Sequence, residues 1–151
     1  AGGDRVTLPK GLKRLNGPRA RGKRARPPIQ GPYVLAFWAT WCKPCTTPEE
    51  LDRLRWLRRE LRSDGLTLLS VAIDGLDKVK GDRRAKTWLY PLWQGDDAHV
   101  DALPRAFIQQ AGMGLPLFAV VDGQGRLRYT RAKALDDVAV VELAAAARSL
   151  D

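Results

Sequence analysis

An unbroken apolar run from Tyr33 to Trp38 constrains the fold of this chain more than any other stretch. Its aromatic and β-branched side chains, without a charge, predict a strand buried on both faces at the centre of a mixed or parallel sheet. Residues 42–63 follow and predict a long helix, because leucines recur there every three or four residues. Residues 66–73 predict a second buried strand. Strand, helix and strand in this order imply a right-handed parallel crossover.

The second half of the chain predicts shorter elements. Residues 82–89 and 101–110 are expected to form helices, and 117–121 and 126–131 flank a glycine-rich turn typical of a β-hairpin. A final helix is expected to begin at a cap formed by Asp136 or Asp137. Its inner face is expected to carry Val140, Val141, Ala144 and Ala147. With 151 residues, this pattern predicts one α/β domain.

The net charge of +9 is concentrated near the N-terminus. Residues 1–30 hold nine of the 26 Lys and Arg and one of the 17 acids, which leaves 17 bases against 16 acids in the remainder. We therefore divide the chain into a basic N-terminal extension, 1–32, with short strands at 6–8 and 13–15 forming a hairpin, and a domain at 33–151. A solvated arm is favoured. Peripheral contact of residues 1–30 with an anionic membrane is the alternative. Nucleic-acid binding is disfavoured because 1–32 lack aromatic side chains.

Charge-free stretches in this chain are too short to cross a bilayer. The longest, 27–42 and 106–121, are interrupted by Pro and Gly, whereas a span needs roughly 20 apolar residues. The chain begins at Ala1 without a Met, so we expect either removal of a signal peptide or anchor, or trimming.

Two cysteines and one histidine exclude several kinds of site. One bridge at most can form, so the chain is no disulfide-rich scaffold. A zinc site needs three or four ligands, and His99 lies in a polar acidic stretch that favours a surface position. We expect no metal and no organic cofactor.

The cysteines stand together as Trp41-Cys42-Lys43-Pro44-Cys45, directly after the first predicted strand. At a helix N-terminus, free backbone N–H groups and the positive end of the macrodipole favour a thiolate. Cys42 is expected to be the exposed nucleophile and Cys45 the sheltered thiol that resolves mixed disulfides. Lys43 adds positive charge, and Pro44 rigidifies the loop.

Structural uses of the pair compete with redox chemistry. A bridge over so short a loop restricts the unfolded chain far less than the roughly 3 kcal/mol of a 15-residue loop, so it is a poor staple. A half-zinc site shared across a dimer would need symmetry that the sequence does not display. A redox-active pair is therefore the favoured interpretation.

Residues 37–45, Phe-Trp-Ala-Thr-Trp-Cys-Lys-Pro-Cys, resemble the active-site segment of the thioredoxin superfamily. The Ala-Thr-Trp-Cys form is most similar to the TlpA/ResA-type branch of extracytoplasmic thioredoxins. Gly114-Leu115-Pro116 and the strand and turn after it resemble that family's cis-proline segment. The resemblance implies that Pro116 is cis and that the Leu115 backbone pairs with an extended substrate. Trp38 and Trp41 are expected to wall the site.

This resemblance implies a thioredoxin-like fold, a central mixed sheet flanked by helices, with a central insertion at 74–112. The implied function is thiol–disulfide exchange, with reduction of partner disulfides outside the cytoplasm. The implied partners are protein thiols and disulfides and an upstream, membrane-bound electron donor. We expect a periplasmic monomer tethered through a removed N-terminal anchor.

The chain departs from the family at the proton acceptor. Ala36 stands where thioredoxin has a buried aspartate six residues before the first cysteine. Relatives that lack this aspartate use a glutamate after the second cysteine, and Glu49 is the candidate here, although Thr46-Thr47-Pro48 is not the usual lead-in. A first-turn acid that suits the helix dipole is the other interpretation of Glu49. Leu117 replaces the glutamate of cytochrome-maturation relatives.

Two further functions remain open at this point. A chaperone-like binding module would hold extended chains in the groove at Pro116, with redox turnover secondary. An adaptor for anionic surfaces would act through residues 1–30, and its binding would be strongly salt-dependent.

Overall fold

The computed structural model describes residues 5–6, 12–15, 29, 31–74, 76–86, 92–95 and 114–150. Six strands form one sheet in the order β1-β4-β3-β2-β5-β6. The strands are β1 (Lys13–Arg14), β2 (Tyr33–Trp38), β3 (Thr67–Ala72), β4 (Leu92–Gln94), β5 (Leu117–Val121) and β6 (Leu127–Arg131). The helices are η1 (Lys43–Cys45), α1 (Pro48–Ser63), α2 (Leu76–Gly81), α3 (Arg83–Lys86) and α6 (Asp137–Arg148).

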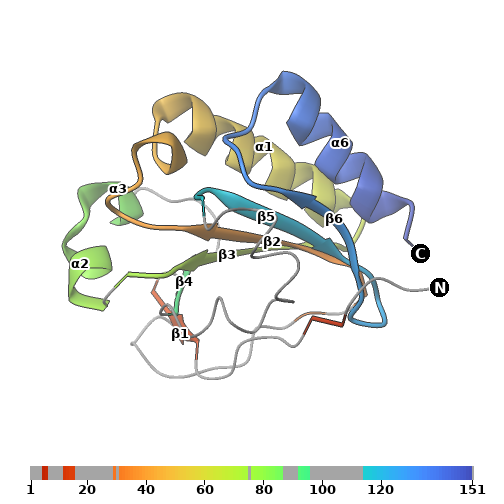
Figure 1. The fold of residues 1–151 in the computed structure, drawn as a ribbon, viewed down its shortest axis with the longest axis horizontal. Coiled ribbons are helices and arrows are strands. Elements are labelled where there is room, and N and C mark those ends of the chain that lie inside the picture. The colour runs from red at the N-terminus through yellow and green to blue at the C-terminus, as the bar shows by residue number, and fades with distance from the viewer. Residues whose placement is uncertain are drawn as a thin grey trace.

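The sheet is mixed, as the sequence predicted. Strand β2 pairs in parallel with β3, and β3 with β4, whereas β5 and β6 continue the other side antiparallel. Helix α1 connects β2 to β3 and packs against α6 on one face of the sheet (Figure 1). The short helices α2 and α3 lie at the end of the sheet where the chain leaves β2 for α1.

The core lies between the sheet and helices α1 and α6. All six residues of β2 and all five of β5 are buried, which explains their unbroken apolar sequences. Helix α1 buries its leucine stripe against β3, and α6 packs on β5 and β2. The predicted inner face of α6 is wrong at Val141, which is 54% exposed; the buried residues are Ala139, Val140, Leu143, Ala144 and Ala147.

Helix α1 begins later than the sequence interpretation placed it. The prediction of one helix over 42–63 is wrong, because the cysteines occupy the separate 3-10 turn η1 and α1 starts at Pro48. Thr47 is its N-cap: the backbone is extended there, as expected before a proline, and the Thr47 hydroxyl accepts a hydrogen bond from Glu50 N–H (3.1 Å). Proline is favoured at the first helical position, where no N–H partner is lost.

The other helix predictions have mixed outcomes. Asp136, one of the two predicted caps, caps α6 through a 2.7 Å hydrogen bond from Ala139 N–H. The helix expected at 82–89 is present as α3, preceded by the unpredicted α2; residues 87–89 lie outside the described residues, as does the helix expected at 101–110. Strand β4 was not predicted, because three residues carry too short a pattern.

Described residues of the N-terminal extension join the sheet. Arg5 forms an isolated bridge with Arg126, and Val6 N–H donates to Gly125 O (2.7 Å). Strand β1 pairs with β4 at the far edge. Val6 and Leu12 are buried in the core, so parts of this segment contribute to packing.

Candidate redox site

The two cysteines lie in the connection from β2 to α1, beyond the carboxyl end of the parallel strands. Cys42 and Cys45 form a disulfide with a Cα–Cα distance of 5.3 Å. Backbone hydrogen bonds fold the loop tightly: Cys42 N–H donates to Ala39 O (3.1 Å), Cys45 N–H to Cys42 O (3.2 Å) and Thr46 N–H to Lys43 O (3.2 Å). These N–H groups therefore already donate to carbonyl oxygens. The prediction that Cys42 lies at the N-terminus of the long helix is wrong, because α1 begins at Pro48.

Burial differs across this segment. Cys42 is 4% exposed and Cys45 is 1% exposed, so the prediction of an exposed Cys42 sulfur is wrong for the disulfide form, in which the bond ties Cys42 to the interior. Trp41 is 65% exposed, and Lys43 and Pro44 are also exposed. A partner can thus meet the loop at Trp41, Lys43 and Pro44.

Pro116 lies at the same end of the sheet as the cysteine loop. The peptide bond between Leu115 and Pro116 is cis, as the family resemblance implied. Strand β5 starts directly afterwards, and Leu117 pairs with Phe37 near the end of β2. This register brings Pro116 and half-buried Leu115 to the edge from which the cysteine loop emerges.

Arg84 of α3 donates hydrogen bonds to the cysteine loop on both sides of the cysteines, a contact that the sequence analysis did not predict. Its guanidinium donates to Thr40 O (2.8 Å) and to the Thr46 hydroxyl (2.5 Å). Asp82 orients the guanidinium by accepting from Nε (3.0 Å) and Nη2 (2.7 Å). Asp82 also accepts from the Arg84 backbone N–H (2.8 Å).

A second polar contact joins the loop to the end of β3. The Asp74 carboxylate accepts hydrogen bonds from both the backbone N–H and the hydroxyl of Thr40. The Gln94 amide donates to Asp74 O (3.1 Å), which connects this contact to β4. The loop is thus fixed by side chains from segments that follow it by more than 30 residues.

The candidate proton acceptor Glu49 is exposed in the first turn of α1, whereas its neighbour Glu50 is 1% exposed. Glu50 Oε1 accepts from Leu135 N–H (2.7 Å), and within the described residues its Oε2 has no hydrogen-bond partner. Burial raises the pKa of Glu50 to about 7, although the Leu135 hydrogen bond and the charges of Arg53 and Arg131 lower it. The buried carboxyl of this region is therefore Glu50.

Within the described ranges, no cluster of three or more His, Cys, Asp or Glu side chains could hold a metal ion. None of the helices in these ranges is long and apolar enough to cross a membrane.

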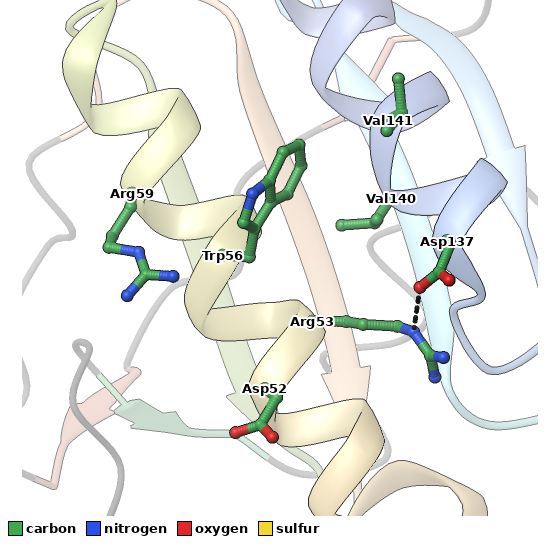
Figure 2. Close-up of a pocket in the computed structure, with 7 residues that line it drawn as sticks. All are labelled: Asp52, Arg53, Trp56, Arg59, Asp137, Val140 and Val141. Carbon is green, nitrogen blue, oxygen red and sulfur yellow. Dashed lines mark hydrogen bonds and ion pairs between the residues drawn. The ribbon is translucent and has the colours of Figure 1, made fainter.

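A groove of about 400 Å³ lies between α1 and α6 (Figure 2). Trp56 faces Val140 and Val141 across it, and Arg53 reaches over to Asp137 (3.3 Å). Its lining is completed by Asp52 and Arg59. No residue of the cysteine loop belongs to this groove.

Comparison with known proteins agrees with this geometry. The family model described as AhpC/TSA matches residues 17–130. The chain belongs to the AhpC/TSA family. Thiol-disulfide oxidoreductase ResA of Oceanobacillus iheyensis is 37% identical over 46 residues, 30% of this chain and 23% of the relative. Thioredoxin-like protein YneN of Bacillus subtilis is 33% identical over 86 residues, 54% of this chain and 44% of the relative. The chain thus matches less than half the length of these relatives.

Solved protein structures share this fold over nearly the whole chain. A thiol:disulfide interchange protein of the thioredoxin family from Chlorobium tepidum superposes with a TM-score of 0.65, covering 97% of this chain and 99% of that one at 19% identity. The predicted thioredoxin-like fold is therefore confirmed. The predicted resemblance to the TlpA/ResA type is confirmed by the relative named ResA.

Proposed function

We propose that this protein is a thiol–disulfide oxidoreductase that reduces disulfides of protein partners outside the cytoplasm. The observation that carries the proposal is the Cys42–Cys45 disulfide in a tight turn at the end of β2. The position of Pro116 at the same sheet edge supports it. The family match and the relative named a thiol-disulfide oxidoreductase also support the proposal.

The reaction begins from the reduced pair. The Cys42 thiolate attacks one sulfur of the partner disulfide, and the other partner sulfur leaves as a thiolate that takes up a proton. Cys45, deprotonated, then attacks Cys42 Sγ in the mixed disulfide and releases the second partner thiol. Two electrons pass to the partner, and the Cys42–Cys45 disulfide forms. A dithiol donor returns two electrons and two protons, so no metal or organic cofactor takes part.

Cys42 is assigned the attack because it directly follows exposed Trp41, at the start of the loop. Trp41, Lys43 and Pro44 present the surface that a partner meets first. The proposed role of the Leu115 backbone, before Pro116, is to pair with an extended partner segment. Glu49 is retained as the candidate proton acceptor, with its exposed position giving direct exchange with solvent.

An oxidising compartment suits this assignment, because a closed disulfide persists there and is rare in the cytosol. The proposed setting is the periplasm or an equivalent space, with a membrane-bound donor supplying electrons. Contact of the basic segment 1–30 with anionic lipid is a proposed addition, supported by its net charge alone.

Cysteine variants test the function directly. We expect wild type to reduce insulin disulfides with dithiothreitol as donor, and Cys42→Ser to lose that activity to background. Cys45→Ser retains the attacking sulfur and is expected to accumulate a mixed disulfide, visible as a mass increase. If the protein were instead a chaperone-like module, wild type and Cys42→Ser would bind unfolded clients with equal affinity. Turnover that survives in Cys42→Ser would refute the proposal.

The direction of electron flow has its own measurement. Equilibration of the cysteine pair with glutathione buffers, followed by the fluorescence of adjacent Trp41, gives the reduction potential. A reductase is expected near the −270 mV of thioredoxin, whereas a value near the −120 mV of strong oxidants would make the protein a disulfide donor.

A further inference from the structure

The cysteine loop is held at both of its ends by one side chain. Thr40 precedes the cysteines and Thr46 follows them, and both accept a hydrogen bond from the Arg84 guanidinium, at 2.8 and 2.5 Å. The two contacts use different nitrogens, Nη2 and Nη1. A planar guanidinium holds two acceptors at once with donors fixed in one plane, whereas the three donors of an ammonium rotate about its flexible stem.

Arg84 is itself held in place. Asp82 accepts from its Nε and Nη2 in a paired arrangement, and the Asp82 side chain is only 10% exposed. The hydrogen bond to Asp82 raises the pKa of the Arg84 guanidinium above its ordinary value, so the positive charge is permanent. Paired, charge-assisted hydrogen bonds of this kind carry more geometric specificity than single ones.

A hydrogen-bond chain leads from Arg84 to the attacking cysteine. The Thr46 hydroxyl, which accepts from Arg84, donates to Cys42 O (3.2 Å), and Thr46 is 5% exposed. Hydrogen bonds in such a chain polarise one another in a low-dielectric interior. The cation therefore acts on the Cys42 backbone through one buried hydroxyl.

The backbone around the cysteines offers little stabilisation to a Cys42 thiolate. Helix α1 starts at Pro48, beyond the cysteines, and the N–H groups of Cys42 and Cys45 already donate to carbonyls. Lys43 is exposed to solvent, where its charge is screened. Arg84, in contrast, contacts both sides of the loop directly.

We propose that Arg84 is a positioning residue of the redox loop: through Thr40 and Thr46 it fixes the backbone of Cys42, and its charge favours the Cys42 thiolate in the reduced protein. This inference rests on the proposed function. It assigns to the α3 segment control of the reactivity of a cysteine about 40 residues earlier in the chain.

Substitution of Arg84 tests the inference. In Arg84→Met, we expect the apparent pKa of Cys42, measured as the pH dependence of iodoacetamide alkylation of the reduced protein, to rise. We also expect the equilibrium constant for reduction by glutathione to fall about three- to tenfold, where tenfold corresponds to about 30 mV. The sign follows because loss of the cation destabilises the thiolate and hence the reduced form.

Two variants separate positioning from charge. Arg84→Lys keeps the charge but loses the paired donors, so its shifts are expected to lie between those of wild type and Arg84→Met, or to equal the latter. Thr46→Val keeps the side-chain volume but removes the hydroxyl relay, and a smaller shift in the same direction is expected. Arg84→Lys indistinguishable from wild type would overturn the positioning role.

Arg148→Met is the matched control. Arg148 also holds two acids, Glu60 and Asp64, and its loss changes the net charge equally, but it lies at the opposite end of α1. We expect it to leave both measurements unchanged. The inference would be overturned if Arg84→Met and Thr46→Val, like Arg148→Met, left the alkylation pH dependence and the glutathione equilibrium unchanged. If Arg84→Met does not fold, the same two measurements on Thr46→Val and Arg84→Lys decide the question. A wild type without insulin reductase activity would refute the proposed function alone, because alkylation and glutathione equilibrium are measured without a protein partner.

Discussion

The two ends of helix α1 are held by different kinds of contact. At the N-terminal end, Thr46 and Glu50 are buried polar residues that bond to segments far along the chain, at Arg84 and Leu135. At the C-terminal end, the buried residues are leucines, and the polar contacts are exposed ion pairs from Arg148. One end is thus fixed by buried hydrogen bonds and the other by apolar packing.

The difference indicates where geometry matters more than stability. Burying a polar group costs free energy unless hydrogen bonds satisfy it, so apolar packing is the cheaper way to hold a helix. Hydrogen bonds, in contrast, fix direction as well as distance. They are concentrated at the end that carries the cysteine loop, where a sulfur must be presented in one orientation.

The largest expected effect is on the apolar end. Leu61 is fully buried, so Leu61→Ala is expected to lower the free energy of unfolding by about 2–5 kcal/mol. Urea unfolding measures this loss, and Val138→Ala, at a position 65% exposed, is the control, with a change within about 0.5 kcal/mol. The glutathione equilibrium of refolded Leu61→Ala should match wild type. A changed equilibrium would mean that apolar packing also tunes the cysteines.

The next effect concerns buried Glu50 at the redox end. Its pKa is about 7 in the folded protein against an ordinary value of 4.5, so the folded state keeps a proton that the unfolded chain releases. The free energy of unfolding should therefore decrease as pH rises from about 4.5 to about 7, by about 3 kcal/mol from this group. Glu50→Gln, which keeps an oxygen for Leu135 N–H, should lose this decrease.

Urea unfolding at pH 4.5, 6 and 7.5 gives the measurement for Glu50. Glu49→Gln removes an exposed carboxyl one residue earlier and should retain the wild-type pH dependence. If Glu49→Gln rather than Glu50→Gln abolished the decrease, the assignment of the titrating group would be wrong.

The smallest effect is expected at the exposed ion pairs. Arg148→Met should lower the free energy of unfolding less than either of the buried-site variants, because exposed pairs gain little in water. The difference from wild type should vanish in 1 M NaCl, where the screening length is about 3 Å. A loss as large as that of Leu61→Ala would show that the two ends of α1 differ less than their burial indicates.

The sheet was predictable because its central strands are unbroken apolar runs. Their period and length leave few alternatives, and strands β2, β3 and β5 were placed within one residue. The start of α1 was missed although its signal is present: Thr47-Pro48-Glu49-Glu50 has the spacing of a capping box after a threonine cap. The predicted helix was based on the recurring leucines and was begun at residue 42, before this signal.

The cysteine pair and the cis proline were predictable from motif resemblance, whereas their polar support was not. Arg84, held by Asp82, contacts the loop only because α3 lies beside it in space, and a tertiary contact of this kind leaves no local pattern in the sequence. Glu50 was missed for a related reason. In a capping box its side chain would bond back to Thr47 N–H, but here it accepts from Leu135 N–H, in the loop before α6.

The charges at the two sheet edges have a consequence for self-association. The outer strands β1 and β6 are short, and they carry Lys13 and Arg14 on one edge and Arg128 and Arg131 on the other. Exposed strand edges invite pairing with a second chain, and lysine and arginine on an edge oppose it. Two copies approaching edge to edge would have to bury these charged side chains, of which Arg128 and Arg131 are ion-paired with Asp122 and Asp136. Among the described residues, both sheet edges therefore carry side chains that oppose the strand addition that leads to aggregation.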